Sequence, residues 1–247
     1  MRFNKQKIIK EAVSIFFIFI GVFAFRSTFY EPYTIPSGSM IPTLKIGDYI
    51  LVDKWSYGFK IPFSEGFPGI DPTKEWNPIY ITPFKAPSRG DVVVFKYPKD
   101  KSINYIKRVV GLPGDELEII DNIVYINGKS YDNVKIPGEN IMKDMDFKFK
   151  HYEFDFYQSK TGEHSHVIQL SRRSFPSNRA KIIIPPDKYF MMGDNRDFSA
   201  DSRYWGFVSK EEILGKALFI WFSMVSPFSD SPFQFRFSRI GTKIDNI

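Results

Sequence analysis

The chain has 247 residues and no cysteine, and it carries 34 Lys and Arg residues against 28 Asp and Glu residues. This length suits one domain with an appendage, and it supports a sizeable core without metal or disulfide staples. The lack of cysteine excludes a thiol nucleophile, a zinc–thiolate site, an iron–sulfur cluster and any disulfide.

The net charge of +6 is concentrated at one end of the chain. Arg2, Lys5, Lys7 and Lys10 are basic, the first ten residues hold no acid, and the rest of the chain is nearly neutral. A nucleic-acid-binding domain spreads a basic face over its body. We therefore expect no nucleic-acid partner.

Residues 8–25 form a predominantly apolar stretch that is interrupted by Lys10 and Glu11 near its start. As a helix this stretch would be about 27 Å long, close to the thickness of the hydrocarbon core of a bilayer. A cleaved signal peptide also fits the basic start, whereas a buried soluble helix is disfavoured because the stretch is apolar on every face. We favour a single membrane anchor over residues 1–26, with the N-terminus in the cytoplasm and the chain from residue 27 across the membrane.

The chain after the anchor is predicted to be mainly β, so the fold class is one N-terminal transmembrane helix followed by one β-rich domain over residues 27–247. Residues 137–180 are polar and charged, and we interpret them as a protruding hairpin inserted in this domain. The β-branched and aromatic runs that predict strands lie at residues 48–52, 91–95, 105–110, 117–120, 124–126, 181–184 and 217–222.

The segment Ile35-Pro-Ser-Gly-Ser-Met-Ile-Pro-Thr-Leu44 follows the anchor closely. Gly38 permits an unusual backbone that would expose Ser39 and aim backbone amides at one point, as a serine nucleophile with an oxyanion site requires. An ordinary turn is the alternative, because Pro, Ser and Gly are the commonest turn residues.

A serine nucleophile needs a base that takes its proton. His151, His164 and His166 all lie in the inserted polar segment, and we interpret them as solvated loop residues rather than as a base or a metal cluster. The base is then a lysine or a carboxylate. Lys107 lies in an apolar predicted strand, where desolvation would lower its pKa and make the neutral amine available, unless it reaches solvent from an edge strand. Arg108 cannot serve, because a guanidinium stays protonated.

The string Gly193-Asp-Asn-Arg-Asp-Phe-Ser-Ala-Asp-Ser-Arg203 holds three aspartates, two arginines, two serines and one asparagine. Such a dense polar segment forms either a surface network of Asp and Arg or a support that fixes a catalytic side chain. Composition does not decide between these two interpretations.

At these segments the chain closely resembles bacterial type I signal peptidase, the membrane-bound serine endopeptidase that cleaves signal peptides from exported proteins. The resemblance implies a mainly β catalytic domain, secretory preproteins and the lipid bilayer as partners, cleavage after small residues at −1 and −3, the bacterial plasma (inner) membrane as location, and no metal or cofactor. The matching strings, in the family's order, are Pro36-Ser-Gly-Ser-Met-Ile-Pro-Thr-Leu44, Arg89-Gly-Asp-Val-Val-Val-Phe95, Tyr105-Ile-Lys-Arg-Val-Val-Gly-Leu-Pro-Gly-Asp115 and the string from Gly193 to Arg203.

The resemblance also implies a role for individual residues. Ser39 would be the nucleophile and Lys107 the general base of a Ser–Lys dyad. Ser37 would complete the oxyanion hole beside the Ser39 N–H, and Ser199 would orient the lysine amine.

Structural ion pairs are implied between Arg108 and Asp194 and between Asp201 and Arg203. The apolar subsites for the small substrate residues are expected to be lined by Tyr33, Ile35, Pro36, Met40, Leu44, Tyr105 and Ile106. Phe198 departs from the family pattern, which leads us to expect a polar residue there. The insert at residues 137–180 matches no motif of the family.

Two other interpretations remain open at this point. A cytosolic Ser–Lys self-cleaving repressor would carry an N-terminal helix-turn-helix in place of the apolar stretch. A non-enzymatic, membrane-tethered β module would leave Lys107 with an ordinary pKa and Ser39 unreactive. The loop at residues 55–84 is interpreted either as a membrane contact or as part of a Phe-rich core, on the basis of Trp55, Tyr57, Phe59, Phe63, Phe67 and Trp76.

Overall fold

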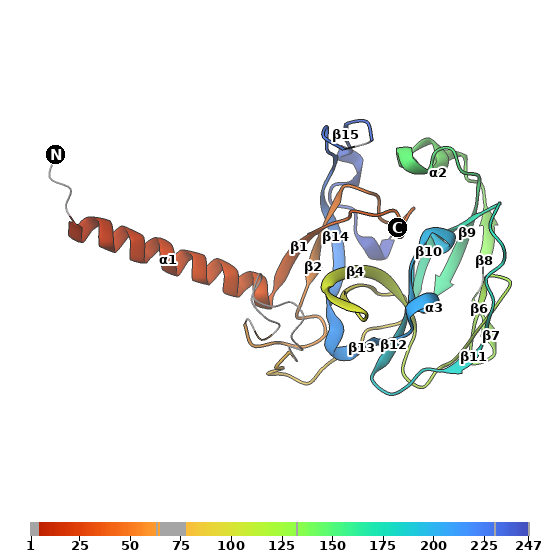
Figure 1. Ribbon diagram of the computed structural model, residues 1–247, viewed down its shortest axis with the longest axis horizontal. Coiled ribbons are helices and arrows are strands. Elements are labelled where there is room, and N and C mark those ends of the chain that lie inside the picture. The colour runs from red at the N-terminus through yellow and green to blue at the C-terminus, as the bar shows by residue number, and fades with distance from the viewer. Residues whose placement is uncertain (1–4, 63, 65–77, 132, 230, 247) are drawn as a thin grey trace.

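The computed structural model describes residues 5–62, 64, 78–131, 133–229 and 231–246, and it has one long helix that projects from a β-rich body (Figure 1). Helix α1, Lys5–Thr28, contacts mainly strand β1, Tyr30–Thr34, and ends two residues beyond the predicted boundary at residue 26. Judged by length and mean hydropathy, none of the helices in these described stretches qualifies as a membrane-spanning segment.

The body of the domain is built on an eight-stranded sheet. Its order is β1-β2-β14-β3-β4-β12-β13, with β15 paired to β14, and the paired strands are antiparallel. The strands that follow β1 in this sheet are β2 Asp48–Asp53, β3 Val92–Tyr97, β4 Asp100–Gly111, β12 Lys188–Met192, β13 Val208–Ser209, β14 Ile213–Val225 and β15 Gln234–Phe235.

Two smaller antiparallel sheets have the strand orders β11-β5-β6-β7 and β10-β9-β8. Their strands are β5 Glu116–Ile120, β6 Ile123–Ile126, β7 Lys129–Ser130, β8 Asn133–Ile136, β9 Phe154–Thr161, β10 His164–Ser171 and β11 Arg179–Ile183. The short helices are α2 Glu139–Lys143 and α3 Ser202–Trp205, and the 3-10 turns are η1 Phe147–Phe149, η2 Arg196–Phe198, η3 Lys210–Glu212, η4 Phe237–Arg239 and η5 Ile244–Asn246.

Strand β3 shows why these sequences form a β core. Val92 and Val94 belong to one buried cluster, and Val93 and Phe95 belong to a second cluster on the other face of the strand. A strand that is covered on both faces needs a continuous apolar run rather than an alternating one. The mainly β prediction is therefore confirmed, and β3 lies at the centre of the sheet that carries the catalytic candidates.

The predicted insert contains the β9–β10 hairpin, but this hairpin packs on the domain instead of protruding. His166 and Ile168 on β10 are buried, with exposed fractions of 1% and 0%. At the tip, a Cβ added to Gly162 would lie 2.6 Å from the carbonyl oxygen of Arg89. The prediction of a protruding segment was wrong because it rested on the polar composition, and polar residues such as His166 are themselves buried in this hairpin.

The described part of the aromatic loop at residues 55–84 contributes one residue to the apolar core, and its contact with a membrane stays a prediction. Tyr57 is buried, whereas Trp55 is 50% exposed. Near the end of α1, the ring of Phe29 lies 6.2 Å from the ring of Trp55 and 5.7 Å from that of Phe59. The other aromatic residues of the prediction, Phe63, Phe67 and Trp76, lie outside the described residues.

Candidate active site

The segment that carries Ser39 is a turn between β1 and β2, held from the other side by Asn195. The backbone N–H of Asn195 donates to the Ser39 carbonyl at 3.1 Å, and its side-chain Nδ2 donates to the Gly38 carbonyl at 2.9 Å. Ser39 itself is buried, with 7% of its surface exposed. Asn195 thereby fixes the backbone on which the serine hydroxyl depends, a role that the sequence did not reveal.

Strand β4 brings Lys107 to this serine. Its Nζ lies 2.7 Å from Ser39 Oγ and donates to the Ile106 carbonyl at 2.9 Å. The ring of Tyr105 covers the amine, with Nζ 5.3 Å from the ring centroid. The two residues are far apart in sequence, so their contact is a direct product of the fold.

The pKa of Lys107 is strongly perturbed. Burial lowers it from 10.5 to about 8, although the nearby carboxylates of Asp201 and Asp194 raise it. Desolvation disfavours an ammonium ion because the apolar surroundings replace its hydration. Lys107 can therefore hold or release a proton near neutral pH, as a general base must.

The serines on either side of this pair are placed differently from each other. Ser37 is exposed, and its Oγ lies 3.5 Å from Ser39 Oγ. Ser199 is buried beside Gly193, where an added Cβ would overlap both Ser199 Oγ and the Ser39 carbonyl. Ser199 Oγ nevertheless has no hydrogen-bond partner among the described residues. The expected bond from Ser199 to Lys107 is thus not formed in this structure, in which the amine bonds to Ser39 and to the Ile106 carbonyl.

The two expected ion pairs are both present behind the dyad. Arg108 meets Asp194 through two bonds of 2.9 and 2.7 Å, and each side chain is 1% exposed. Thr43 donates to the same carboxylate at 2.6 Å. Burial alone would raise the pKa of Asp194, but Arg108 and its other partners bring it below its ordinary value.

Asp201 and Arg203 form the second pair, with two bonds of 2.8 Å. Asp201 also accepts the backbone N–H of Gly193 at 3.0 Å and is the N-cap of α3. These contacts hold the segment at residues 193–203 together, and the carboxylate of Asp201 lies near enough to Lys107 to raise its pKa. The dense string of Asp and Arg is therefore a buried support rather than a surface network.

The residues expected to line the substrate subsites fall into three groups. Ile35, Met40 and Leu44 are buried in one apolar cluster, against which Tyr33 and Ile106 pack with part of their surface exposed. Tyr105 packs on a different cluster. Pro36 is exposed. The structure thus brings five of the seven predicted residues together in one apolar cluster. We name it the acyl-side cluster, because the resemblance leads us to expect the acyl part of the substrate there.

The unexpected Phe198 is explained by the insert. Its ring lies 5.4 Å from the ring of Phe149, 4.8 Å from Tyr152 and 5.9 Å from Phe154, and all three of these belong to residues 137–180. An aromatic side chain at this position buries apolar surface against the insert, which a polar residue would not do. The departure at residue 198 and the insert are therefore two parts of one packing arrangement.

The interpretation of the histidines as solvated loop residues is wrong for His166. This side chain is 1% exposed, and its Nε2 lies 3.7 Å from Oδ1 of Asp194. Burial, reinforced by the charge of Arg108, lowers its pKa to about 3. Its position on the buried face of β10 was hidden by the polar residues around it in the sequence.

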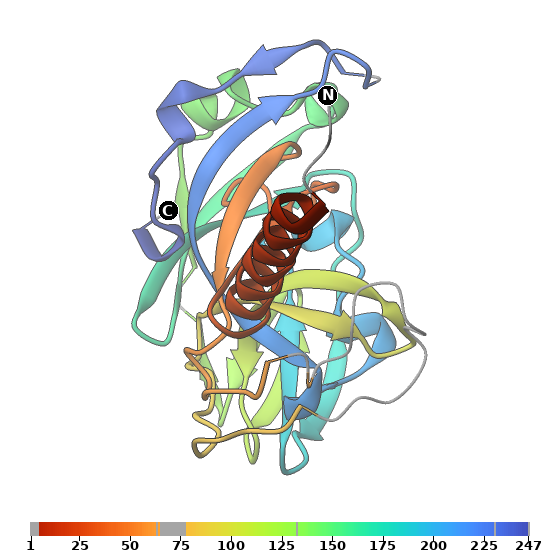
Figure 2. The ribbon, with the colours of Figure 1, turned by 90° about the vertical axis from the view of Figure 1, so that its left-hand side faces the viewer.

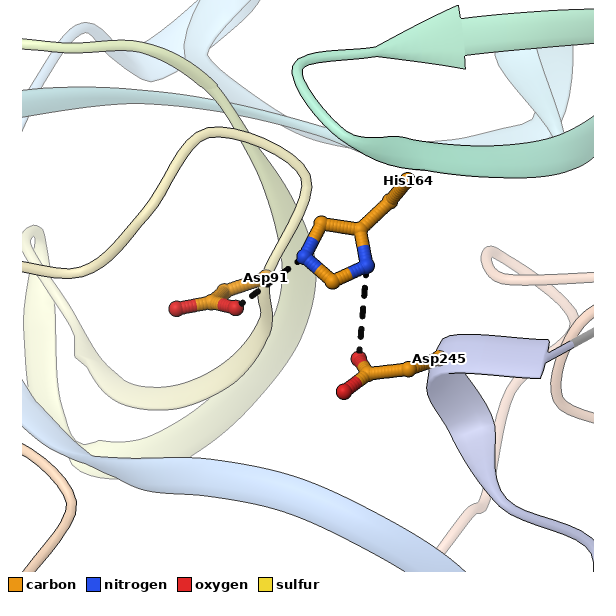
Figure 3. A group of neighbouring side chains, drawn as sticks. All are labelled: Asp91, His164 and Asp245. Atoms are coloured by element: carbon orange, nitrogen blue, oxygen red, sulfur yellow. Dashed lines mark ion pairs between the residues drawn. The ribbon is translucent and has the colours of Figure 1, made fainter.

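His164 belongs to a second polar group, in which its ring lies between Asp91 and Asp245 (Figure 3). These residues could each offer one ligand atom to a metal ion, and the atoms lie within 4.8 Å of one another. However, the ammonium of Lys216 already bridges the two carboxylates, at 2.8 Å from Asp91 and 3.0 Å from Asp245. A metal ion would have to displace this ammonium. We therefore describe the group as a set of ion pairs that joins turn η5 to β10 and β14.

Comparisons with known proteins place the sequence among signal peptidases. A family model described as signal peptidase, peptidase S26, matches residues 8–222. A Signal peptidase I from Pseudomonas fluorescens is 41% identical over 97% of this chain and 81% of its own length. A Signal peptidase I from Buchnera aphidicola subsp. Acyrthosiphon pisum is 35% identical over 97% of this chain and 83% of its own length. A solved signal peptidase I from Enterococcus faecalis is 28% identical and covers 53% of this chain and 97% of its own, with a TM-score of 0.32.

Proposed function

We propose that this chain, which belongs to the signal peptidase family, peptidase S26, removes signal peptides from secretory preproteins by means of a Ser39–Lys107 dyad. The chain is a peptidase of the signal peptidase I type. The observation that carries the dyad is the distance of 2.7 Å between Ser39 Oγ and a Lys107 amine whose pKa is lowered to about 8. A serine hydroxyl acts as a nucleophile when an adjacent base takes its proton.

The proposed reaction has two halves. Neutral Lys107 takes the proton of Ser39 Oγ while this oxygen attacks the carbonyl carbon of the scissile bond. The protonated amine then gives its proton to the leaving nitrogen, which breaks the C–N bond and leaves an acyl-enzyme. In the second half, neutral Lys107 takes a proton from a water molecule, the hydroxide attacks the ester, and the proton returns to Ser39 Oγ.

Other groups would stabilise the charge and hold the substrate. In our proposal Ser37 and the backbone N–H of Ser39 stabilise the oxyanion, which is the charge that develops in the transition state. The acyl-side cluster would receive the small residues at −1 and −3. Ser199, Asp201, Arg203, Arg108 and Asp194 would support the dyad from behind, the last four through the two buried ion pairs.

The dyad is tested by processing of a preprotein in detergent by Ser39→Ala and Lys107→Ala variants. Both are expected to lose cleavage by at least about a thousandfold, because each removes a group that touches the reacting atoms. Lys96→Ala is the matched control, since Lys96 lies partly exposed on the neighbouring strand β3 and should leave cleavage unchanged. Cleavage near the wild-type rate by either dyad variant would refute the proposal.

We further propose that α1 anchors the enzyme in the bacterial plasma membrane, with a cytoplasmic N-terminus and an extracytoplasmic domain from about residue 27. Apolar side chains are exposed around the helix, among them Phe16, Phe17 and Ile18 with exposed fractions of 60%, 64% and 64%. Burial of this surface in lipid would be strongly favourable. An anchor would also raise the effective concentration of enzyme and preprotein in one layer.

Flotation with liposomes tests the anchor. The full chain is expected to float with vesicles of neutral lipid and to remain bound at 1 M salt, because apolar insertion is insensitive to screening. A chain that starts at residue 27 is the comparison. If the full chain stays at the bottom of the gradient, α1 is not an anchor. If the shortened chain also floats, the domain binds lipid without α1.

A further inference from the structure

The turn that carries Ser39 lies between two apolar clusters. Met40, directly after the nucleophile, belongs to the acyl-side cluster. Ile41, the next residue, belongs to a different cluster, in which it meets Phe154 and Phe156 of the insert. The direction of the chain therefore places one apolar surface on each side of the serine.

The second surface ends in three aromatic side chains, Phe149, Tyr152 and Phe198, which we name the aromatic ledge. Phe149 and Phe198 pack on the cluster that contains Ile41, and Tyr152 packs on these two rings. All three side chains keep part of their surface exposed, and the exposed fraction of Tyr152 is 37%. Their ring centroids are separated by 4.8 to 6.3 Å. Such offset and edge-to-face arrangements form a stable apolar surface with open aromatic faces.

The aromatic ledge lies directly against the nucleophile segment. A Cβ added at Gly38 would overlap the ring of Phe149, so this ring touches the residue that precedes Ser39. Phe198 is followed at once by Ser199, which is buried next to the Ser39 carbonyl. The exposed aromatic surface therefore begins within one residue of the reacting hydroxyl.

We propose that the aromatic ledge is the subsite for the polypeptide on the leaving side of the scissile bond, and that it favours apolar or aromatic side chains in the first two residues after the cleavage site. The inference rests on the proposed function, because it takes the acyl side of the substrate to lie over the acyl-side cluster. An extended substrate that crosses Ser39 then continues over the opposite surface. Contact with aromatic rings favours apolar side chains and gives little to small or negatively charged ones.

The ledge also gives the insert a role. Phe149 and Tyr152 both come from residues 137–180, whereas Phe198 comes from the catalytic segment. The insert and the aromatic replacement at residue 198 together create a surface that neither would form alone. Selectivity for the start of the mature protein would therefore be a property of this chain's own insert.

The test compares two preprotein substrates that differ in the two residues after the cleavage site, Leu-Phe in one and Gly-Ser in the other. We measure kcat/KM for both substrates with the full-length enzyme and with the Tyr152→Ala and Phe149→Leu variants. The wild type should prefer the Leu-Phe substrate, and each variant should lower this preference about 3- to 10-fold, as expected for loss of an aromatic contact. Tyr152 is partly exposed, so its variant keeps the fold even if the change at Phe149 does not.

Phe147→Ala is the matched control, because Phe147 lies in the same turn η1 but is 56% exposed and outside the ledge. Its preference should equal that of the wild type. An equal loss of kcat/KM for both substrates would show that the ledge only positions the turn. Unchanged kcat/KM values for both substrates would show that the ledge does not contact the substrate. Either result overturns the subsite. If the wild type cleaved neither substrate, the proposed function itself would be refuted.

Discussion

At the scale of single residues, the environment of Lys107 favours its neutral form. The side chain is 4% exposed, and burial outweighs the attraction of the two carboxylates behind it. An arginine at this position could not act as a base, and a lysine in water would be almost entirely protonated at neutral pH. The chemistry of the dyad thus depends on the packing around one amine as much as on the amine itself.

The first prediction concerns the pH dependence of catalysis. Because the protonated amine cannot accept the serine proton, kcat/KM should rise with pH through the pKa of Lys107, about 8. Below that value the increase should approach tenfold for each pH unit, and about a tenth of the enzyme should be competent at pH 7. Stopped assays of a peptide substrate between pH 5.5 and 9.5 measure the profile. A rate that is independent of pH over this range would contradict the assignment of the base.

The second prediction concerns the buried pair of Arg108 and Asp194. Asp194→Asn should lower the free energy of unfolding by about 3 to 5 kcal/mol, because it leaves an uncompensated guanidinium in the core. Urea unfolding of the two proteins measures the difference. Lys181→Ala, which breaks an exposed pair with Glu116, is the control and should cost less than about 1 kcal/mol. Equal losses of unfolding free energy for the two substitutions would show that the buried pair stabilises the protein no more than the exposed pair does.

The catalytic candidates could be predicted because their chemistry is local to short strings. The residue types around Ser39 and Lys107 left an ordinary turn and a solvent-facing lysine open, and the resemblance of these short strings to signal peptidase supplied the two roles. Asn195 and His166 could not be assigned in the same way, because their roles depend on which backbone or carboxylate the fold brings to them. Long-range contacts of this kind leave no periodic signal in the sequence.

At the scale of elements, the β9–β10 hairpin is part of the domain core. His166 lies on its buried face beside Asp194, next to Ile168 along the strand. Strand pairing places His166 opposite Ser159 and His164 opposite Thr161. Phe154 and Phe156 of β9 are buried in one cluster with Ile41 of the segment that carries Ser39, and polar residues of the hairpin such as Gln169 are buried as well.

A third prediction follows from the burial of His166. Its pKa is about 3 in the folded protein and near 6.5 when unfolded, so the unfolded chain binds the extra proton between these values. Its contribution to stability is therefore present above about pH 6.5 and is lost as the pH falls toward 3, with a slope of about 1.4 kcal/mol per pH unit. Urea unfolding at several pH values should show a shallower acid dependence for His166→Gln.

His151→Gln provides the comparison for this measurement, because His151 is exposed. It should retain the acid dependence of the wild type. Identical slopes for the wild type and the His166→Gln variant would show that this histidine is not held neutral by the fold.

Element prediction succeeded where a strand is buried on both faces. Strand β3 is covered on both faces. The apolar run at residues 217–222 also predicted the central part of β14, although Trp221 in it is 43% exposed. For β9 and β10 a hairpin was predicted, but not its packing on the core, because several of its buried residues are polar, among them His166 and Gln169. The helical stretch of α1 was predicted, but its end was placed at residue 26 rather than at Thr28.

At the scale of the whole molecule, α1 stands apart from the domain (Figures 1 and 2). The four apolar clusters are all built from residues after α1. The domain core is therefore complete without the helix. Thr28 at the junction is buried, so a shortened chain should retain it.

The fourth prediction is that the chain from residue 27 folds and keeps its chemistry. Its unfolding midpoint in urea should equal that of the full chain within error, and its kcat/KM on a short soluble peptide should stay within about threefold, because the dyad and its supports lie wholly in the domain. Circular dichroism and a peptide assay measure the two quantities. Loss of cooperative unfolding on removal of α1 would show that the helix is an integral part of the fold.

Acylation of Ser39 tests the central claim most directly. The full-length enzyme is treated with a penem-type serine acylator and digested, and mass spectrometry locates the adduct. We predict a stoichiometric adduct on the peptide that contains Ser39 and almost none in a folded Lys107→Ala variant, since the hydroxyl is a poor nucleophile without its base. An adduct on another residue, or equal labelling of Ser39 without Lys107, would contradict the Ser–Lys dyad.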